Sequence, residues 1–400
     1  MDTNPSLIKI VNGHIITPNG IIRNGSVLVR DGIIVNVSDH DPEMPGAKIL
    51  DAGGKFVSAG FIDIHVHGGG GYDFMDNTVE AFLEIAKIHA RYGTTALFPT
   101  TLTGSAEDIV STLKTYDEAY PLNESGSEFM GVHLEGPYFA MNQRGAQDPQ
   151  WIRDPDPEEY KYIISQSNSI KRWSAAPELK GAIPFARYLG SKGILASLAH
   201  TDAIYEEVLE GFENGYTLAT HLYSAMSGVT RRNAYRFAGA VESAFIIDDM
   251  DVEIIADGIH LPAPLLKLIF KIKGPGRIAL ITDAMRGAGM PPGESVIGNI
   301  HTGMKVIVED GVSKMPDRKS FAGSVATADR LVRTMIQIAD VSLTDAIRMM
   351  TLTPAIIMKI DDRKGSLSSG KDADIVIFDD QINVYTTIVR GKIVYQSPVE

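Results

Sequence analysis

The sequence predicts an α/β protein with two parts, a (β/α)8 barrel of the TIM type and a small β-sandwich domain formed by both chain termini. The chain has 400 residues, which suits a barrel of ordinary size with an accessory domain. Its middle alternates apolar, strand-like segments with helical ones, as expected for a parallel sheet with crossover helices. Its ends carry short strands separated by turns. We therefore expect the β-domain over residues 1–57 and 360–400, and the barrel over residues 58–359.

The terminal segments show the pattern of antiparallel strands. Near the N-terminus, β-rich apolar runs end at Asn-Gly or Asp-Gly dipeptides, which favour tight hairpin turns. The C-terminal segment continues in the same style, with strands expected over 373–378, 385–390 and 393–395. The three turn dipeptides are Asn12-Gly13, Asn19-Gly20 and Asp31-Gly32.

The middle of the chain supplies the strands and helices of the barrel. Residues 78–92 place apolar side chains at helical spacing and predict a helix. Ser105 is expected to cap the next helix, because its hydroxyl can accept a free backbone N–H group. The expected strands cover residues 61–65, 96–99, 129–134, 172–175, 194–197, 218–221, 252–256 and 278–282.

Composition excludes several classes of function. A formal net charge of −13 offers no electrostatic footprint for nucleic acid, although a few local arginines can still bind a small phosphorylated substrate. The absence of cysteine excludes disulfides, thiolate metal ligands and a cysteine nucleophile. The polar N-terminus lacks a signal peptide's apolar core, and no apolar run approaches the roughly 20 residues that cross a bilayer. We therefore expect a soluble cytoplasmic protein that binds neither nucleic acid nor membrane.

Metal-capable side chains recur where the predicted strands end. Each has an ordinary structural interpretation when taken alone, as a hydrogen-bonded histidine, a turn or a helix cap. In a barrel, however, the carboxyl ends of consecutive strands meet at one face, where function is found. Imidazole and carboxylate ligands without sulfur suit a divalent metal that keeps a position open for catalysis. The six side chains are His65, His67, Glu135, His200, His221 and Asp283.

The chain resembles the amidohydrolase superfamily and, within it, the N-acetylglucosamine-6-phosphate deacetylase family. The superfamily resemblance rests on Phe61-Ile-Asp-Ile-His-Val-His and on Gly365-Ser-Leu-Ser-Ser-Gly-Lys-Asp-Ala-Asp-Ile-Val. The family's motifs occur in its own order and cover nearly the whole chain. They are His133-Leu-Glu-Gly-Pro-Tyr, Ala176-Pro-Glu, Ala199-His-Thr-Asp-Ala, Thr220-His-Leu-Tyr-Ser-Ala-Met, Ala256-Asp-Gly-Ile-His, Ile281-Thr-Asp-Ala-Met and Phe321-Ala-Gly-Ser.

The resemblance implies a site with one or two divalent ions. Glu135, His200 and His221 would hold the main ion, and family members with a complete His-x-His motif use it for a second one. This chain has both histidines of that motif. Glu135 would also be the bridging carboxylate, so that Lys171 is expected to be an ordinary surface residue. Zinc is the first expectation for the metal, with iron, manganese and cobalt as alternatives, because all accept these ligands.

The same resemblance implies a deacetylation mechanism. Metal binding lowers the pKa of a water toward about 7, and the resulting hydroxide attacks the acetyl carbonyl. Asp283 would act as the general base and pass the proton to the leaving amine. His260 would bind the substrate and stabilise the oxyanion. The loop Ala322, Gly323 and Ser324 would lie against the sugar.

Three departures from the family pattern affect substrate binding. Ser224, followed by Ala225, stands where the family has Asn beside the substrate phosphate. Gln147 replaces a sugar-binding His. The family's phosphate-gripping arginine, which reaches across a homodimer interface, has three candidates here. These are Arg231, Arg232 and Arg236, of which we carry Arg232 and Arg236 forward as site residues.

Several alternatives stay open at this point. The altered sugar-side residues leave N-acetylgalactosamine 6-phosphate or another acylated amino sugar as the substrate. A different amidohydrolase activity, on a cyclic amide or in deamination, would keep the same metal ligands. A metal-free scaffold that has lost catalysis is disfavoured, because every expected ligand and the expected base are intact.

Overall fold

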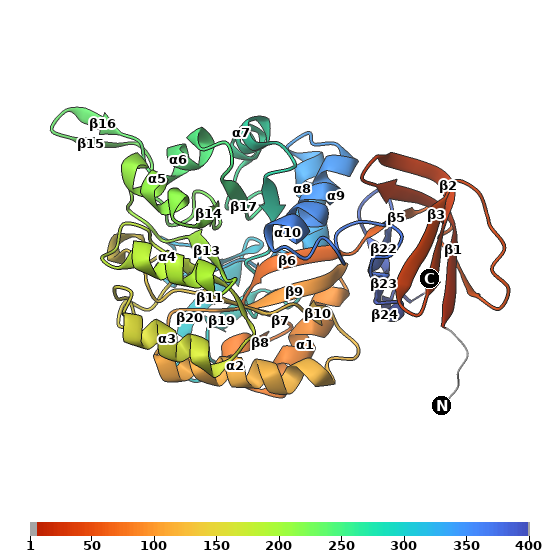
Figure 1. Cartoon of the computed structure of the whole chain (residues 1–400), viewed down its shortest axis with the longest axis horizontal. Helices are drawn as coiled ribbons and strands as arrows, with labels where there is room; N and C mark the ends of the chain where they lie inside the picture. Colours follow the sequence, from red (N-terminus) through yellow and green to blue (C-terminus); the bar gives the residue numbers. More distant parts are fainter. Residues whose placement is uncertain (1–5, 399–400) are drawn as a thin grey trace.

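The computed structural model describes residues 6–398 and contains a barrel and a smaller β-domain at one side of it (Figure 1). The eight barrel strands run parallel to their neighbours, which confirms the predicted (β/α)8 fold. They occur around the barrel in their order along the sequence, as short connections require. The strands are β6 (Phe61–Val66), β9 (Thr94–Thr101), β11 (Val132–Glu135), β12 (Ile170–Ala175), β13 (Leu195–Leu198), β14 (Tyr216–Ala219), β17 (Asp251–Ile254) and β18 (Ile278–Leu280).

The barrel closes where the end of β6 meets the segment after β18. The Asp283 N–H donates to the carbonyl of His65 at 2.9 Å, and the His67 N–H donates to the carbonyl of Ala284 at 2.9 Å. Val66 and Ala284 form a parallel bridge at the same place. Closure therefore brings Asp283 next to His65 and His67, although more than two hundred positions separate it from them in the sequence.

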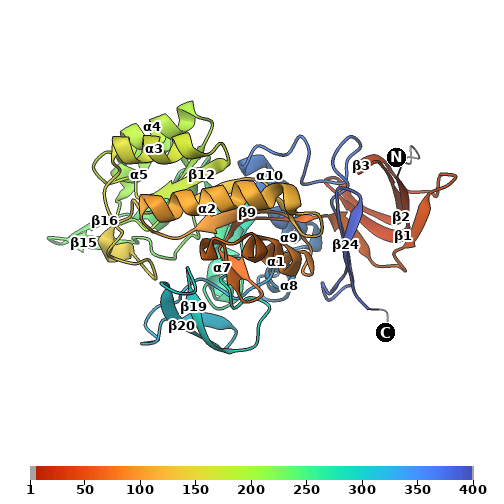
Figure 2. The same cartoon turned by 90° about the horizontal axis from the view of Figure 1, so that it is seen from below.

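Helices surround the barrel on the outside (Figures 1 and 2). The Thr78 side chain accepts the Ala81 N–H at 3.2 Å, and Ser105 accepts the Asp108 N–H at 3.1 Å. Both predicted helix starts are thus confirmed. The helices are α1 (Val79–Ala90), α2 (Ala106–Ala119), α3 (Pro157–Gln166), α4 (Ala182–Ser191), α5 (Tyr205–Glu213), α6 (Ala240–Ile246), α7 (Ala263–Lys273), α8 (Ala328–Gln337), α9 (Leu343–Met350) and α10 (Leu352–Ile357).

The β-domain is one eight-stranded sheet that both chain termini build, on the right in Figure 1. The two ends of the chain join where β5 and β22 pair antiparallel. Order across the sheet is β24-β23-β22-β5-β1-β2-β3, with β4 paired to β1. The strands are β1 (Leu7–Thr17), β2 (Gly20–Arg30), β3 (Ile33–Ser38), β4 (Lys48–Asp51), β5 (Phe56–Ala59), β22 (Ile375–Phe378), β23 (Val384–Val389) and β24 (Lys392–Gln396).

Two local predictions are wrong in detail. Asn12-Gly13 is not a hairpin turn, because β1 continues through it as an irregularity in the pairing with β2, with Asn12 at φ 56°. The strand predicted over 129–134 is two strands, β10 (Glu128–Phe129) and β11, separated by Gly131 at φ 119°. At Asn12 a left-handed residue disturbs the pairing without ending the strand, whereas at Gly131 it separates two strands, so a left-handed residue alone does not decide whether a strand ends.

Three further β-structures lie outside the predicted pattern, of which the smallest is the antiparallel pair β7 (Gly68–Gly69) and β8 (Tyr72–Asp73). A hairpin of β15 (Thr230–Arg232) and β16 (Tyr235–Phe237) projects from the barrel at the upper left of Figure 1. A three-stranded sheet of β19 (Gly293–Ile297), β20 (Met304–Glu309) and β21 (Val312–Lys314) lies beside the barrel (Figure 2). Over the described range 6–398, none of the helices has both the length and the apolar character needed to cross a membrane.

Candidate metal centre

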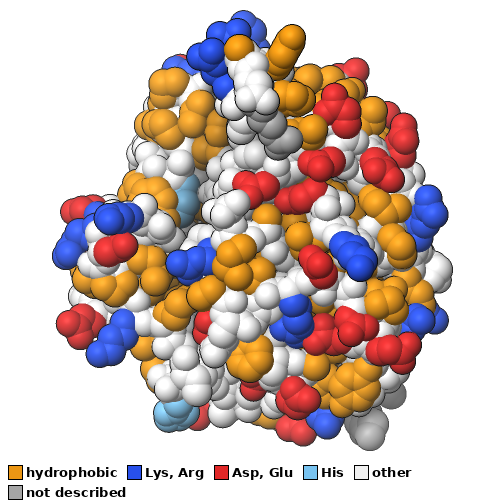
Figure 3. Space-filling view, turned by 90° about the vertical axis from the view of Figure 1, so that its left-hand side faces the viewer, with side chains coloured by type: hydrophobic (Ala, Val, Ile, Leu, Met, Phe, Trp, Pro, Cys, Tyr) orange, Lys and Arg blue, Asp and Glu red, His pale blue; other side chains and the backbone are white. Residues whose placement is uncertain are grey.

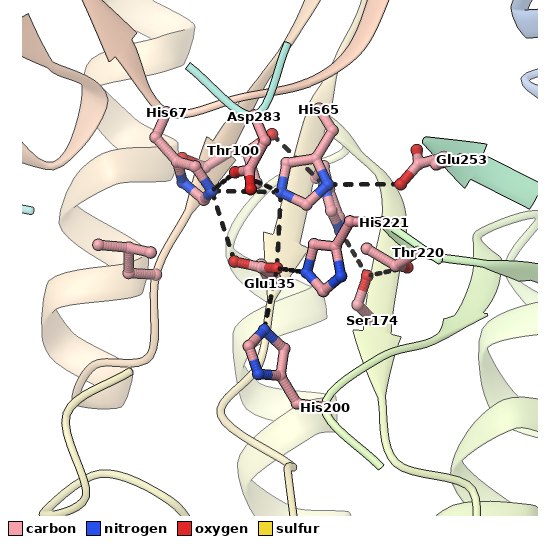
Figure 4. A network of polar contacts seen from close by, with 12 residues as sticks. His65, His67, Thr100, Glu135, Ser174, His200, Thr220, His221, Glu253 and Asp283 are labelled. Carbon is pink, nitrogen blue, oxygen red and sulfur yellow. Dashed lines mark hydrogen bonds and ion pairs between the residues drawn. The ribbon is translucent and has the colours of Figure 1, made fainter. Parts of the chain in front are cut away.

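All six predicted strand-end side chains meet at one place (Figure 4). Glu135 lies in the middle. Its Oε1 is 2.9 Å from His221 Nε2 and 3.4 Å from His200 Nε2, on one side. On the other side, its carboxylate oxygens lie 3.5 Å from His65 Nε2 and 3.4 Å from His67 Nε2. Glu135 is therefore placed to serve both histidine pairs, as a bridging carboxylate would be.

Asp283 completes the half of the site that contains the His-x-His motif. Its Oδ1 lies 3.1 Å from His67 Nε2 and 3.5 Å from His65 Nε2. The two Nε2 atoms are themselves 3.2 Å apart. The predicted spacing argument, that residues two apart on a strand face the same way, agrees with this geometry.

The outer nitrogens of three histidines have acceptors that fix the direction of the inner ones. Nδ1 of His67 is 3.2 Å from the carbonyl of Thr100, and Nδ1 of His200 is 2.7 Å from the carbonyl of Gln143. Nδ1 of His65 is 3.4 Å from Glu253 Oε2. Because these acceptors hold a proton on Nδ1, each ring turns its Nε2 toward Glu135 and offers a lone pair there once Nε2 carries no proton. Each half of the site therefore offers two imidazole nitrogens and the Glu135 carboxylate, which fit a divalent cation, so the residues present suit the group that the sequence implies.

Three of the site residues have a left-handed backbone. His200, His221 and Asp283 have φ values of 47°, 32° and 46°. Such values are uncommon for residues other than glycine and concentrate at functional sites. Here they turn the chain sharply after β13, β14 and β18, so that each side chain enters the barrel mouth.

Burial and charge determine the protonation of the cluster. Although burial opposes ionisation of carboxylates, the neighbouring histidines hold the pKa of Glu135 well below its usual range and also lower the pKa of Asp283. Burial likewise opposes the charged form of His67, but Asp283 and Glu135 raise its pKa to about 9. The metal-free centre thus holds anionic carboxylates against a protonated histidine, and a cation that binds there replaces that proton.

Sequence analysis missed a pair of charged residues beneath this centre. Arg172 on β12 and Glu253 on β17 are both 0% exposed and form a bidentate ion pair. Glu253 is also the acceptor that faces His65. The available signal was a charged residue within a strand expected to line the barrel, since charges are almost never fully buried unless they are paired.

A cavity of about 460 Å³ opens onto the metal centre. In the face shown in Figure 3 the surface is hollowed, with a histidine at the edge of the hollow. The predicted substrate residues that line the cavity are Gln147, Ser224, Ala225, His260 and Gly323. Residues that sequence analysis did not select also line it, among them Asn142, Arg144 and Phe321.

His260 presents one nitrogen to the cavity. Its Nδ1 donates to Asp257 Oδ2 at 2.8 Å, so Nε2 is the free acceptor. Its ring packs against Phe321 with a centroid distance of 4.5 Å. Gln147 has less freedom, because its NH2 donates to Glu135 Oε2 at 2.8 Å and its oxygen accepts the Thr103 N–H at 2.9 Å.

Other predicted residues lie away from the cavity. Ala322 and Ser324 are buried behind Gly323, and Ser324 Oγ donates to the Thr282 carbonyl at 2.5 Å. Lys171 is exposed, as predicted. Arg231 and Arg236 are exposed on the β15–β16 hairpin and do not line the cavity of their own chain. Arg232 belongs to β15, but its side chain lies outside the described part of the structure.

Residues 56–394 match the amidohydrolase family, which is the class that the barrel and its histidine–carboxylate centre define. The chain is 35% identical over 388 residues to the N-acetylglucosamine-6-phosphate deacetylase of Bacillus subtilis, covering 96% of each chain. It is 30% identical over 382 residues to the N-acetylgalactosamine-6-phosphate deacetylase of Escherichia coli O157:H7, covering 95% of this chain and 97% of the relative.

Solved structures agree with these relatives. The Pasteurella multocida N-acetylglucosamine-6-phosphate deacetylase superposes with a TM-score of 0.90 at 27% identity, covering 98% of this chain and all of that one. A point mutant of the Mycobacterium smegmatis enzyme, in complex with N-acetyl-D-glucosamine-6-phosphate, superposes with a TM-score of 0.89 at 27% identity and the same coverage. The chain therefore belongs to the N-acetylglucosamine-6-phosphate deacetylase family of the amidohydrolases.

Proposed function

We propose that this chain is a metal-dependent hydrolase that removes the acetyl group from an N-acetylated amino-sugar 6-phosphate. The first substrate is N-acetylglucosamine 6-phosphate, with glucosamine 6-phosphate and acetate as products. The observation that carries the proposal is Glu135 between two histidine pairs, with Asp283 beside it, at the base of a cavity of about 460 Å³.

Two groups of side chains would hold divalent ions. Each group places three ligand atoms within 4.8 Å of one another and contains Glu135, once with His65 and His67 and once with His200 and His221. A divalent cation bound there supplies Lewis acidity, which polarises the acetyl carbonyl and lowers the pKa of a water to about 7. We take zinc as the ion, since nitrogen and carboxylate ligands with an open position suit it.

The protein's own part in the chemistry is to move one proton and to orient the amide. Asp283 is the group placed to take a proton from the attacking water and to deliver it to the leaving amine, since an amide nitrogen leaves poorly until it is protonated. His260 turns Nε2 into the cavity and, when protonated there, donates to the carbonyl oxygen or to a sugar hydroxyl. Asp257 fixes that orientation through Nδ1.

Two sets of arginines are candidates for binding the phosphate of the substrate. Arg144 lines the cavity of its own chain and can meet the phosphate directly. Arg231 and Arg236 project on the hairpin, where basic side chains gather above the hollow in Figure 3. An arginine on a projecting hairpin reaches a neighbouring subunit more easily than its own cavity, which supports a homodimer. We further propose a cytoplasmic location, for which the cysteine-free composition suits a reducing compartment.

A related sugar is the second candidate. The E. coli relative acts, by its name, on N-acetylgalactosamine 6-phosphate. Ser224 lines the cavity where the family has Asn, and the Gln147 amide contacts Glu135 and Thr103. Both differences alter the sugar side of the cavity and favour testing the galacto epimer beside the gluco form.

The test is acetate release from N-acetylglucosamine 6-phosphate, its galacto epimer and unphosphorylated N-acetylglucosamine. Each reaction runs with chelator-treated protein and with protein reloaded with Zn²⁺. Metal-dependent turnover confined to the 6-phosphates supports the proposal, and the faster epimer identifies the sugar. No turnover of any of the three by metal-loaded protein would show that the substrate class is wrong.

A further inference from the structure

The buried Arg172–Glu253 pair beneath the metal centre is fully hydrogen-bonded. An arginine has five N–H donors, and each of those of Arg172 has an acceptor. Two donate to the two carboxylate oxygens of Glu253. The other three acceptors are the Ile64 carbonyl at 3.2 Å, Ser197 Oγ at 2.9 Å and Thr220 Oγ1 at 2.7 Å.

Burial of such an ion pair costs free energy, so its presence here requires an explanation. Removing two charges from water carries a desolvation cost that the ion pair alone often fails to recover. Glu253 uses its position for one further contact, since its Oε2 faces His65 Nδ1 at 3.4 Å (Figure 4). The carboxylate therefore holds the proton on Nδ1, and Nε2 of His65 is left as a lone-pair donor at the metal centre.

The acceptor of His65 differs from those of the other histidines of the centre. His67 and His200 donate to backbone carbonyls, and Nδ1 of His221 has no hydrogen-bond partner within the part of the chain that the structure describes. Of the four, His65 alone has a carboxylate acceptor at Nδ1 among the described residues. A carboxylate makes its imidazole partner a stronger ligand than a carbonyl does.

We infer that Glu253, held by Arg172, is a positioning residue that sets the tautomer of His65 and thereby controls ion binding by the His65–His67–Glu135 half of the centre. The His200–His221–Glu135 half does not depend on it. This inference rests on the metal centre of the proposed function, but it concerns ion occupancy and not the substrate.

Glu253→Gln tests the inference with little change of shape. The two oxygens of Glu253 accept three N–H groups, two from Arg172 and one from His65. An amide offers one oxygen and adds donors of its own, so His65 loses its anionic acceptor and the tautomer with a proton on Nε2 becomes accessible. That proton faces the centre and opposes an ion. Loss of such a partner typically weakens metal binding about 10–100-fold.

The experiment counts ions in the full-length protein without substrate. Chelator-treated wild type and Glu253→Gln are titrated with Zn²⁺ by calorimetry, and metal content is measured after desalting. We expect two ions per chain in the wild type and one in the variant, with the tighter Kd unchanged and the weaker one raised about 10–100-fold. Glu159→Gln, which breaks another Arg–Glu pair through Arg153, is the matched control and should keep both ions.

Each outcome of this experiment either supports or overturns the role inferred for Glu253. Two ions with unchanged affinities in Glu253→Gln, loss of both ions together, or a wild type that binds a single ion would overturn the inference. If Glu253→Gln fails to fold, the double variant Arg172→Met/Glu253→Gln removes both charges and is scored by the same ion count. A wild type that binds two ions but releases no acetate would refute the proposed function and leave this inference standing.

Discussion

Replacement of Asp283 by Asn separates proton transfer from metal binding. The Asp283 backbone is left-handed, with φ 46°, and Asn adopts this region more readily than most residues, so the fold should accept the change. Asn keeps a carbonyl oxygen to face His67, where Oδ1 now lies at 3.1 Å. What the variant loses is the anionic oxygen that can accept a proton from water and return it to the amine.

The expected loss of catalytic rate follows from the one step that Asp283→Asn removes, which is proton transfer. A positioned general acid or base contributes about 10²–10⁴-fold to the rate. This corresponds to about 2.7–5.4 kcal/mol in the activation barrier. We expect kcat for acetate release to fall by that factor, with KM changed much less and with the ion content of the wild type retained.

Asp340→Asn is the matched control for this variant. Asp340 is also left-handed, with φ 58°, but it is exposed and pairs at the surface with Lys267. Its kcat should equal that of the wild type. An Asp283→Asn protein with full metal content and wild-type kcat would refute the assignment of the proton shuttle to Asp283.

Four further predictions test other parts of the molecule. Lys364→Met should lower the free energy of unfolding by about 3–5 kcal/mol, because it leaves the buried carboxylates of Asp372 and Asp374 and the partly buried one of Glu128 without the ammonium that lies 2.5–3.0 Å from them. Urea denaturation measures this, and exposed Lys392→Met should cost only about 0–1 kcal/mol. Hydrogen bonds from His260 and the backbone hold the pKa of Asp257 below its ordinary value although burial acts to raise it. Ionised Asp257 therefore contributes stability above its unfolded-state pKa of about 3.9, and this contribution is lost as the pH falls through the lower pKa of the folded state. The difference in the free energy of unfolding between wild type and Asp257→Asn should therefore narrow below about pH 4. Chelation should lower the melting temperature, and Zn²⁺ at about 100 times its Kd should restore about 2.7 kcal/mol; an unchanged melting curve would argue against a bound ion. Arg236→Met should weaken binding of the 6-phosphate by about 1.5–3 kcal/mol, seen as a higher KM, while the unphosphorylated sugar is unaffected.

The residues of the metal centre that could be predicted from the sequence are those at the ends of strands. In a parallel barrel all strands finish at one face, so a polar residue after an apolar run is placed by the strand alone. His65 lies near the end of β6 and His67 directly follows that strand, and His200 and His221 follow β13 and β14. Position along the chain thus fixed which side chains meet, without knowledge of any contact between strands.

The unpredictable part depends on contacts across the barrel. Arg172 lies inside β12 and Glu253 inside β17, separated by 81 positions. Each strand also carries a second charged residue, Lys171 on β12 and Asp251 on β17, so the local sequence does not single out the buried pair. Only the closed barrel shows that Arg172 and Glu253 neutralise each other. The hairpin arginines raise the same difficulty, since their role depends on where a projecting segment points and not on its local pattern.

The loop 322–324 has a structural role that was not expected from its sequence motif. The Ser324 N–H donates to the Asp283 carbonyl at 2.7 Å, and a side chain added at Gly323 would meet that carbonyl oxygen at 3.1 Å. The Asp283 N–H in turn donates to the carbonyl of His65 at 2.9 Å. Both backbone groups of Asp283 are therefore held while its φ stays in a region that costs free energy for most residues. A residue held in this way cannot relax when charge develops beside it, which is the condition for an efficient proton shuttle. Ser324 and Gly323 thus hold the backbone of Asp283 from behind, whether or not a sugar touches them.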